Sequence, residues 1–299
     1  MNRLPYTMEF RFADANGSYE QSKYVILGVP YDRTTSFRPG TRFAPQAIRQ
    51  VSWNFELYSY RHNIKFTEIP VHDGGDVEEC GSTEELWTKL EELASKILGD
   101  GKFPVIIGGE HSITPPIIKA MKAHHKEVGV LIIDAHMDFR DSYLNDKCSH
   151  ACSTRRITEL IGVNNILLMG FRSASEEEFQ DAKTAKLNFI DIYQIHSEGF
   201  ENSLKKALNI IKTEKLYLSI DIDGIDPAYA PGTGTPEPFG LISFDLLTLI
   251  SKIHSRLIGM DIVEINPIFD NSGITSALAT KIIRETITMH WTSVKRLNV

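Results

Sequence analysis

The sequence of 299 residues contains only three cysteines, Cys80, Cys148 and Cys152. Three thiols cannot form a framework of disulfide pairs, and their spacing matches no zinc-binding motif. We therefore expect free thiols in a reducing compartment, which favours a cytoplasmic protein. The sequence has no run of about 20 apolar residues, so it predicts no membrane span. The first residues, Met1–Pro5, also lack the apolar centre of a secretory signal.

An excess of positive charge is also absent. The formal net charge is −7 at pH 7, with 32 Lys and Arg residues against 39 Asp and Glu residues. A general nucleic-acid-binding protein would carry a basic stripe, so we expect no nucleic-acid partner. The sequence shows no internal repeat, low-complexity segment or linker, and 42% of its residues are hydrophobic. These properties predict one globular domain over residues 1–299.

Short apolar runs recur along the chain and are typical of strands buried on both faces of a parallel sheet. They are Tyr24–Val29, Val105–Ile107, Gly129–Ile133, Ile166–Met169, Phe189–Ile192, Leu216–Ile220 and Ile258–Val263. Helical periodicity lies between them, as in Thr83–Leu98, where apolar residues recur every three or four positions. The alternation predicts an α/β fold, a three-layer α/β/α sandwich with a central, mainly parallel sheet.

Polar residues follow three of these runs, where each predicted strand ends. The patches are Gly108–Ser112, Asp134–Asp138 and Asp221–Asp223. Because ligands of open α/β sheets bind outside the carboxyl ends of the strands, we expect the patches to meet there, together with Glu264. Carboxylate oxygens mixed with imidazole favour a pair of divalent ions of the manganese kind over structural zinc or a calcium cage. The candidate ligands are His111, Asp134, His136, Asp138, Asp221 and Asp223.

Each patch also has a purely structural interpretation. The polar residues of Asp134–Asp138 stand at alternate positions and project to one side of an outgoing strand, which favours an ion site over a capped strand end. Taken alone, Asp221 and Asp223 are compatible with a solvated turn, and a lone histidine such as His111 is more often structural. Their shared position at strand ends favours the functional interpretation for all three patches.

These segments resemble the ureohydrolase family, which includes arginases and agmatinases. The motifs that carry the resemblance are Gly108–Ser112, Asp134–Asp138, Ser219–Pro227 continuing into Pro231–Pro236, and Val263–Pro267. The resemblance spans Tyr31 to Glu285. Within the family, the segment Thr35–Pro45 and the segment around His150 look most like agmatinase. An arginase-like fold is therefore expected.

The resemblance implies a binuclear site with two Mn²⁺ ions per subunit. The ligands it implies are Asp134 and Asp221 as bridges, His111 and Asp138 for one ion, and His136 and Asp223 for the other. Such a metal pair makes a water nucleophilic near neutral pH. The family also implies a homo-oligomer, a trimer or a hexamer.

The activity that the resemblance implies is hydrolysis of a guanidinium group to urea and an amine. Glu264 would hold the cationic guanidino substrate through charge-assisted hydrogen bonds, with Thr235 also in the substrate site. His150 matches the histidine that passes a proton to the leaving amine. Asp138 would accept a hydrogen bond from the attacking water.

Agmatine is the substrate that the short stretch from residue 138 to residue 150 favours. That stretch lacks the insert by which arginases hold the amino-acid end of arginine, so we expect putrescine and urea as products, in polyamine biosynthesis. Asp141 or Asp146 is available to meet the distant ammonium group.

Three departures from the agmatinase pattern leave other substrates open. Ala151–Ser153 replaces the usual residues after His150, Phe239 stands where the family usually has glycine, and Arg140 is available to a carboxylate. The alternatives are N1-aminopropylagmatine, arginine or a guanidino acid. A non-catalytic metal-binding relative is a further alternative, which the complete set of ligands disfavours.

Overall fold

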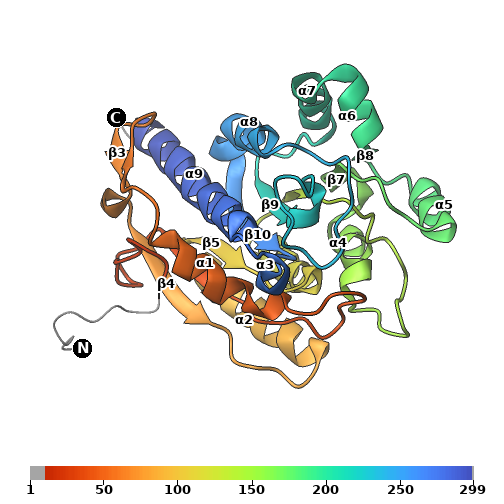
Figure 1. The fold of residues 1–299 in the computed structure, drawn as a ribbon, viewed down its shortest axis with the longest axis horizontal. Helices are drawn as coiled ribbons and strands as arrows, with labels where there is room; N and C mark the ends of the chain where they lie inside the picture. Colours follow the sequence, from red (N-terminus) through yellow and green to blue (C-terminus); the bar gives the residue numbers. More distant parts are fainter. Residues whose placement is uncertain (1–10, 298–299) are drawn as a thin grey trace.

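A computed structural model describes residues 11–297, so the segment Met1–Pro5 lies outside the described residues. Its centre is an eight-stranded sheet in the order β4-β1-β5-β10-β9-β6-β7-β8, and all neighbouring strands are parallel. The strands are β1 Tyr24–Gly28, β4 Val71–Asp76, β5 Phe103–Ile107, β6 Gly129–Ile133, β7 Ile166–Met169, β8 Phe189–Ile190, β9 Leu216–Asp221 and β10 Leu257–Val263. Figure 1 shows the sheet surrounded by helices.

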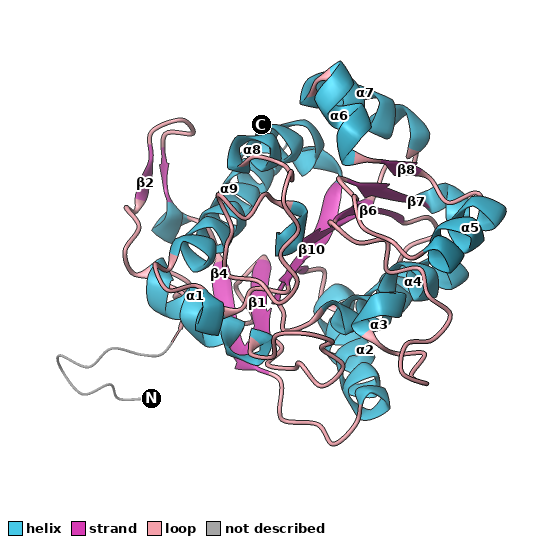
Figure 2. Cartoon of the chain, turned by 45° about the vertical axis from the view of Figure 1, so that its right-hand side comes forward, coloured by secondary structure: helices cyan, strands magenta, loops and turns pink. Residues whose placement is uncertain are grey.

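The helices cover both faces of the sheet. On one face the core contains α1 (Ala44–Ser52), α6 (Ile192–Glu198), α7 (Phe200–Ile210), α8 (Ser243–Ile253) and α9 (Ile274–Leu297). On the other face it contains α2 (Thr83–Gly99), α3 (Thr114–His124), α4 (Ser153–Ile161) and α5 (Glu176–Ala185). Figure 2 shows the sheet between α1, α8 and α9 on one side and α2, α3 and α4 on the other. The predicted three-layer α/β/α sandwich is therefore confirmed.

Alternate residues of a strand pack into opposite cores. In β5, Val105 and Ile107 belong to one core cluster, whereas Ile106 belongs to the other. Because both faces of the sheet are covered, every position of the strand is apolar and the sequence shows a continuous run. In the described residues no helix is both long and apolar enough to cross a membrane.

Some elements differ from the sequence prediction. The strand expected at Phe189–Ile192 ends at Ile190, because the side chain of Asp191 accepts a hydrogen bond from the backbone N–H of Gln194 and begins α6. The edge strand β4 and a small hairpin of β2 (Tyr58–Ser59) and β3 (Ile64–Lys65) were not predicted. Both are short or polar, so neither has an apolar run that would reveal it.

The strand order places the polar patches next to one another. The four neighbouring strands β5, β10, β9 and β6 form the middle of the sheet. Each of them ends directly before, or within, a segment that carries a candidate functional residue. Since the strands are parallel, all four segments leave the sheet at the same edge.

A buried histidine gives the fold a pH-dependent stability. The Nδ1 atom of His290 lies 2.7 Å from the hydroxyl of Tyr24, and burial, with a smaller effect of Lys23, lowers the pKa of His290 from 6.5 to about 4. The unfolded chain therefore binds a proton between pH 6.5 and about 4 that the folded chain does not bind. The contribution of His290 to the free energy of unfolding is complete above pH 6.5. It falls by roughly 3 kcal/mol as the pH drops to about 4.

We expect the substitution His290→Gln to flatten this part of the pH dependence, because an amide does not titrate. Thermal unfolding of protein freed of metal by a chelator, at pH 7.5 and at pH 5, measures the effect. The substitution His196→Gln, at an exposed position of α6, serves as the control. An equal loss of stability at pH 5 in the wild type and in His290→Gln would show that His290 does not cause this pH dependence.

Candidate active site

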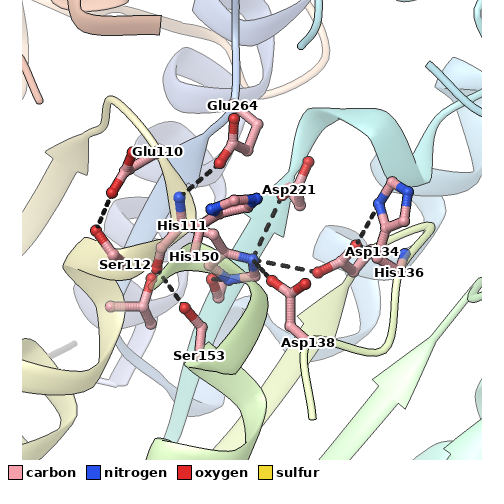
Figure 3. A network of polar contacts seen from close by, with 12 residues as sticks. Glu110, His111, Ser112, Asp134, His136, Asp138, His150, Ser153, Asp221 and Glu264 are labelled. Atoms are coloured by element: carbon pink, nitrogen blue, oxygen red, sulfur yellow. Dashed lines mark hydrogen bonds and ion pairs between the residues drawn. The ribbon is translucent and has the colours of Figure 1, made fainter. Parts of the chain in front are cut away.

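The site lies where the four central strands end. His111 follows β5, Asp134 follows β6, Asp221 closes β9 and Glu264 follows β10. Figure 3 shows the imidazole of His111 among the carboxylates of Asp134, Asp138 and Asp221. The structure therefore brings together side chains that are more than 150 positions apart in the sequence, as the backbone N–H of His111 and the carboxylate of Glu264 illustrate.

One group of candidate ligands surrounds His111. Its Nδ1 atom lies 3.2 Å from Asp134 Oδ2, 3.2 Å from Asp138 Oδ2 and 3.4 Å from Asp221 Oδ2. His111 is fully buried and the three aspartates are at most 6% exposed. The three carboxylate oxygens and the ring nitrogen thus face a common point.

A second group surrounds His136. Its Nδ1 atom lies 3.0 Å from Asp223 Oδ2 and 3.8 Å from Asp134 Oδ1. Asp134 therefore presents one carboxylate oxygen to each group. The hydroxyl of Thr235 donates a hydrogen bond of 2.9 Å to Asp223 Oδ2 and helps to fix that carboxylate.

The buried acids and histidines of the site shift one another's pKa values. Burial, reinforced by Asp138, raises the pKa of Asp134 to about 7. Burial and the Asp223 carboxylate likewise raise the pKa of Asp221. Burial would lower the pKa of His111, but the surrounding carboxylates outweigh it and raise that pKa well above its ordinary value. These shifts arise because several acids share a dry site in which they cannot all ionise.

The donor atoms fit two divalent cations. His111 Nδ1 and Asp134 Oδ2 are buried and have no hydrogen-bond partner among the described residues. Such orphaned atoms are costly unless a ligand satisfies them. Two candidate metal-binding groups share Asp134, and their atoms lie within 4.8 Å of one another in each group. The groups are His111, Asp134 and Asp221, and Asp134, His136 and Asp223.

A buried network orients His111 for this task. Ser219 Oγ lies 3.1 Å from His111 Nε2 and donates its own hydrogen to Asp261 Oδ1 at 2.6 Å. The serine oxygen must therefore accept a hydrogen bond from Nε2–H, which leaves Nδ1, on the side of the carboxylates, available to a cation. Asp261 is fully buried and also accepts hydrogen bonds from Thr114 and Tyr217. Partners of this kind fix the tautomer of metal-binding histidines.

We expect the substitution Asp261→Asn to lower the affinity for Mn²⁺ by roughly 10- to 100-fold. The reason is that a neutral amide accepts the hydrogen bond from the hydroxyl of Ser219 more weakly than a carboxylate does. Competition with a chelator of known affinity measures the change. Tyr217→Phe, which removes only one of the three donors to Asp261, should have a smaller effect. An unchanged affinity in Asp261→Asn would show that the network does not orient His111.

Glu264 is fixed on several sides. Its backbone N–H donates to Gly109 O at 2.8 Å, its carbonyl accepts from Thr233 Oγ1 at 2.9 Å, and its Oε1 accepts from His111 N at 2.8 Å. The residue has a φ of 61°, a left-handed conformation that is unusual for glutamate and recurs at functional sites. Burial and the charge of Glu110 raise the pKa of Glu264.

A cavity of about 150 Å³ opens above this cluster. It joins both ligand groups to Glu264, His150 and Thr235, and it continues past Tyr143 to Arg140 and Glu178. The predicted catalytic and substrate-binding residues therefore line one cavity together with most of the predicted ligands. His111 and Asp134 lie beneath it, fully buried.

Two residues expected to meet an ammonium group lie elsewhere. Asp141 is exposed and pairs with Arg156 at 3.1 Å and Lys147 at 3.4 Å. Asp146 accepts a hydrogen bond from the backbone N–H of Cys148. Neither lines the cavity. The prediction for these two aspartates was wrong, because each is held by its own turn or by neighbouring cations.

The departures from the agmatinase pattern have structural explanations. Phe239 has a φ of 69°, a conformation that favours glycine, but its side chain is 79% exposed and does not line the cavity. Cys152 is buried, and Ser153 donates a hydrogen bond of 3.0 Å to the backbone carbonyl of His111. Among Phe239, Ala151, Cys152 and Ser153, only Ala151 reaches the cavity wall, and the third departure, Arg140, lines it as well.

Sequence reasoning missed two residues at the rim of the site. Glu178 lines the cavity, and its Oε1 accepts a hydrogen bond from Phe139 N at 2.7 Å. Arg172 binds the backbone carbonyls of Asp223 and Glu237 and so ties the adjacent loop to the ligand cluster. Glu178 belongs to a capping box with Ser175, so its sequence context indicated a helix start rather than a binding site.

The chain is similar to known proteins over most of its length. The model of the Arginase family matches residues 22–289. An agmatinase of Bacillus anthracis is 38% identical over 278 residues, which cover 92% of this chain and 94% of that protein. An N(1)-aminopropylagmatine ureohydrolase of Thermococcus kodakarensis is 34% identical over 267 residues, covering 86% of this chain and 88% of that protein.

A comparison with solved structures leads to the same family. The crystal structure of the agmatine ureohydrolase of Thermoplasma volcanium is 40% identical in sequence, has a TM-score of 0.92 and covers 97% of each chain. These similarities confirm the resemblance that the sequence motifs indicated. The chain belongs to the arginase family, and within that family it is similar to agmatinases.

Proposed function

We propose that the protein is a manganese-dependent ureohydrolase that converts agmatine and water to putrescine and urea. The observation that carries the proposal is a single cavity in which Glu264 and His150 face the paired ligand groups around His111 and His136. Mixed carboxylate and imidazole donors suit manganese. The proposal includes one catalytic domain that works in the cytoplasm with two Mn²⁺ ions.

Each group in the cavity has a role in this reaction. The two ligand groups would hold two divalent ions, which would supply a water acidic enough to act as a nucleophile near neutral pH. Glu264 binds the guanidinium group and orients its carbon toward the ligand cluster. Asp138 accepts a hydrogen bond from the attacking water. His150 supplies a proton to the amine nitrogen as its bond to the guanidinium carbon breaks.

The charges of the cavity support a cationic substrate. Two divalent ions would offset the charges of its aspartates, which leaves the carboxylate of Glu264 as the negative group of the wall that faces a substrate. A cavity lined by one sign of charge attracts ligands of the opposite sign.

The far end of the cavity supports an amine in preference to an amino acid. Among the described residues that line the cavity, Arg140 is the only arginine or lysine, and its Nη2 lies 3.8 Å from Glu178 Oε2. The guanidinium of Arg140 also packs over the ring of Tyr143 at 5.4 Å. Because Glu178 offsets the charge of Arg140, the carboxylate of arginine or of a guanidino acid gains little there. The proposal places the ammonium group of agmatine beside Glu178.

A substrate panel tests the proposal. Urea release is measured with agmatine, N1-aminopropylagmatine, arginine and 4-guanidinobutyrate at equal concentrations. We expect the largest kcat/KM for agmatine. A large preference for arginine would contradict the proposal, and a preference for N1-aminopropylagmatine would move the assignment to the longer polyamine.

A further inference from the structure

The proposed function leaves Glu110 without a role, although it lies beside His111 in the motif Gly108–Ser112. Its side chain is fully buried and accepts hydrogen bonds from four donors. The donors are Thr34 N at 2.8 Å, Thr34 Oγ1 at 2.6 Å, Thr35 Oγ1 at 3.4 Å and Ser112 Oγ at 2.7 Å. A carboxylate surrounded in this way acts only as an acceptor.

The hydroxyl of Thr34 links Glu110 to His150. Since its hydrogen points to Glu110, the Thr34 oxygen is left as an acceptor. It receives the backbone N–H of His150 at 3.0 Å and lies 3.1 Å from His150 Nδ1. Thr34 and His150 are 116 positions apart, so the contact joins the loop after β1 to the short turn that precedes α4.

This arrangement selects one tautomer of His150. The accepting Thr34 oxygen is nearer to Nδ1, at 3.1 Å, than the hydroxyl of Ser149, at 3.3 Å, so the geometry favours the neutral imidazole that carries its hydrogen on Nδ1. The Nε2 atom then has the free lone pair, and Ser36 Oγ lies 3.4 Å from it. Ser36 lines the cavity together with His150. The nitrogen available for proton transfer is therefore Nε2, on the side of the ring away from Thr34 and Glu110.

We propose that Thr34 and Glu110 are positioning residues that hold His150 as the Nδ1–H tautomer and so reserve Nε2 for proton transfer. The role of His150 rests on the proposed function. In the reaction, Nε2 takes a proton released by the attacking water and gives it to the amine nitrogen. The electron pair of the broken C–N bond binds that proton, while Nδ1–H stays on Thr34.

Paired substitutions of Thr34 separate this role from simple packing. Thr34→Val keeps the shape and removes the hydroxyl, whereas Thr34→Ser keeps the hydroxyl and removes the methyl group. We expect kcat of Thr34→Val to fall roughly 100-fold, with KM changed less than about threefold. Thr34→Ser should keep kcat within about threefold of the wild type. The opposite order, a larger loss in Thr34→Ser, would overturn the proposal.

A control in the same loop tests whether the effect passes through the imidazole. The hydroxyl of Thr35 lies 3.4 Å from Glu110 Oε2, whereas the side chains that His150 meets through hydrogen bonds in the described part of the chain are those of Thr34, Ser36 and Ser149. We expect Thr35→Val to keep kcat within about threefold of the wild type. A loss equal to that of Thr34→Val would point to a disturbed loop and would overturn the proposal.

The tautomer itself is measured without turnover. Metal-free protein labelled with ¹⁵N-histidine is examined by long-range ¹H–¹⁵N NMR, and His150→Asn identifies the signals of His150. We expect the Nδ1–H tautomer in the wild type and in Thr34→Ser, and a mixture in Thr34→Val. An Nε2–H tautomer in the wild type would overturn the proposal even if the enzyme hydrolyses agmatine. Conversely, the expected spectra in a protein that releases no urea would refute only the proposed function.

Thr34→Val and Thr34→Ser leave the other charged and polar residues near His150 chemically unchanged. The ring of Tyr143 meets the imidazole edge-on at 6.0 Å, and Ser149 Oγ lies 3.3 Å from Nδ1. Asp138, Glu178, Glu264 and Arg140 line the same cavity. Since Thr34→Val alters none of these groups, a change in tautomer is attributable to the lost hydroxyl.

Discussion

Replacing Asp138 by asparagine should reduce the turnover of agmatine on the order of 10³-fold, the scale at which the loss of one electrostatic catalytic group acts. Asp138 Oδ2 lies 3.2 Å from His111 Nδ1, and the residue also lines the cavity. Asparagine keeps the shape but loses the charge needed by a cation and by the attacking water. The φ of Asp138 is 49°, a left-handed conformation that asparagine tolerates, so the backbone is not strained by the change.

The assay measures urea release at saturating Mn²⁺, together with the manganese content of the purified variant. Asp141→Asn is the matched control, because Asp141 is three positions away, exposed and outside the cavity. It should retain the activity of the wild type. Full turnover in Asp138→Asn would remove Asp138 from the catalytic site, whereas a wild type that released no urea would favour a non-catalytic role for the ligand cluster.

Replacing Glu264 by glutamine should lower kcat/KM for agmatine by roughly 10- to 100-fold, the loss expected from hydrogen bonds to a charged group worth about 1.5–3 kcal/mol. Glutamine keeps an oxygen that can accept the hydrogen bond from His111 N. It loses the negative charge that a guanidinium group requires.

The two ends of the substrate are separated by using butylguanidine, which has the guanidinium group of agmatine but no ammonium group. We expect Glu264→Gln to impair the hydrolysis of both compounds. Glu178→Gln should impair the hydrolysis of agmatine and leave that of butylguanidine almost unchanged. If Glu264→Gln left both values of kcat/KM unchanged, the guanidinium group would not bind at Glu264.

The sequence was sufficient to predict the centre of the fold because local chemistry is strong there. The run before Asp134 is apolar at every position, since its residues pack into two cores in turn. The edge strand β4 has no such run, because its polar residues face Arg49, whose guanidinium contacts Asp73 through two atoms at 2.8 and 2.9 Å. An ion pair with Arg49, 24 positions earlier in the sequence, holds β4, and such a contact produces no apolar periodicity in the strand.

The same distinction applies to the site. The candidate ligands could be predicted because they follow buried strands at fixed spacing. The partners that orient them could not, because Asp261 reaches His111 only through Ser219, and Thr34 meets His150 from 116 positions away. Such contacts depend on the packing of the whole sheet and its loops, and short motifs do not encode them.

The balance of products from agmatine, measured with chelated and reconstituted enzyme, tests the central claim most directly. We predict that chelation abolishes activity and that Mn²⁺ restores it at about two ions per chain, the number that a pair of ligand groups accommodates. Urea and putrescine should then appear in equal amounts. Undiminished activity after complete removal of metal, or release of ammonia in place of urea, would contradict the account.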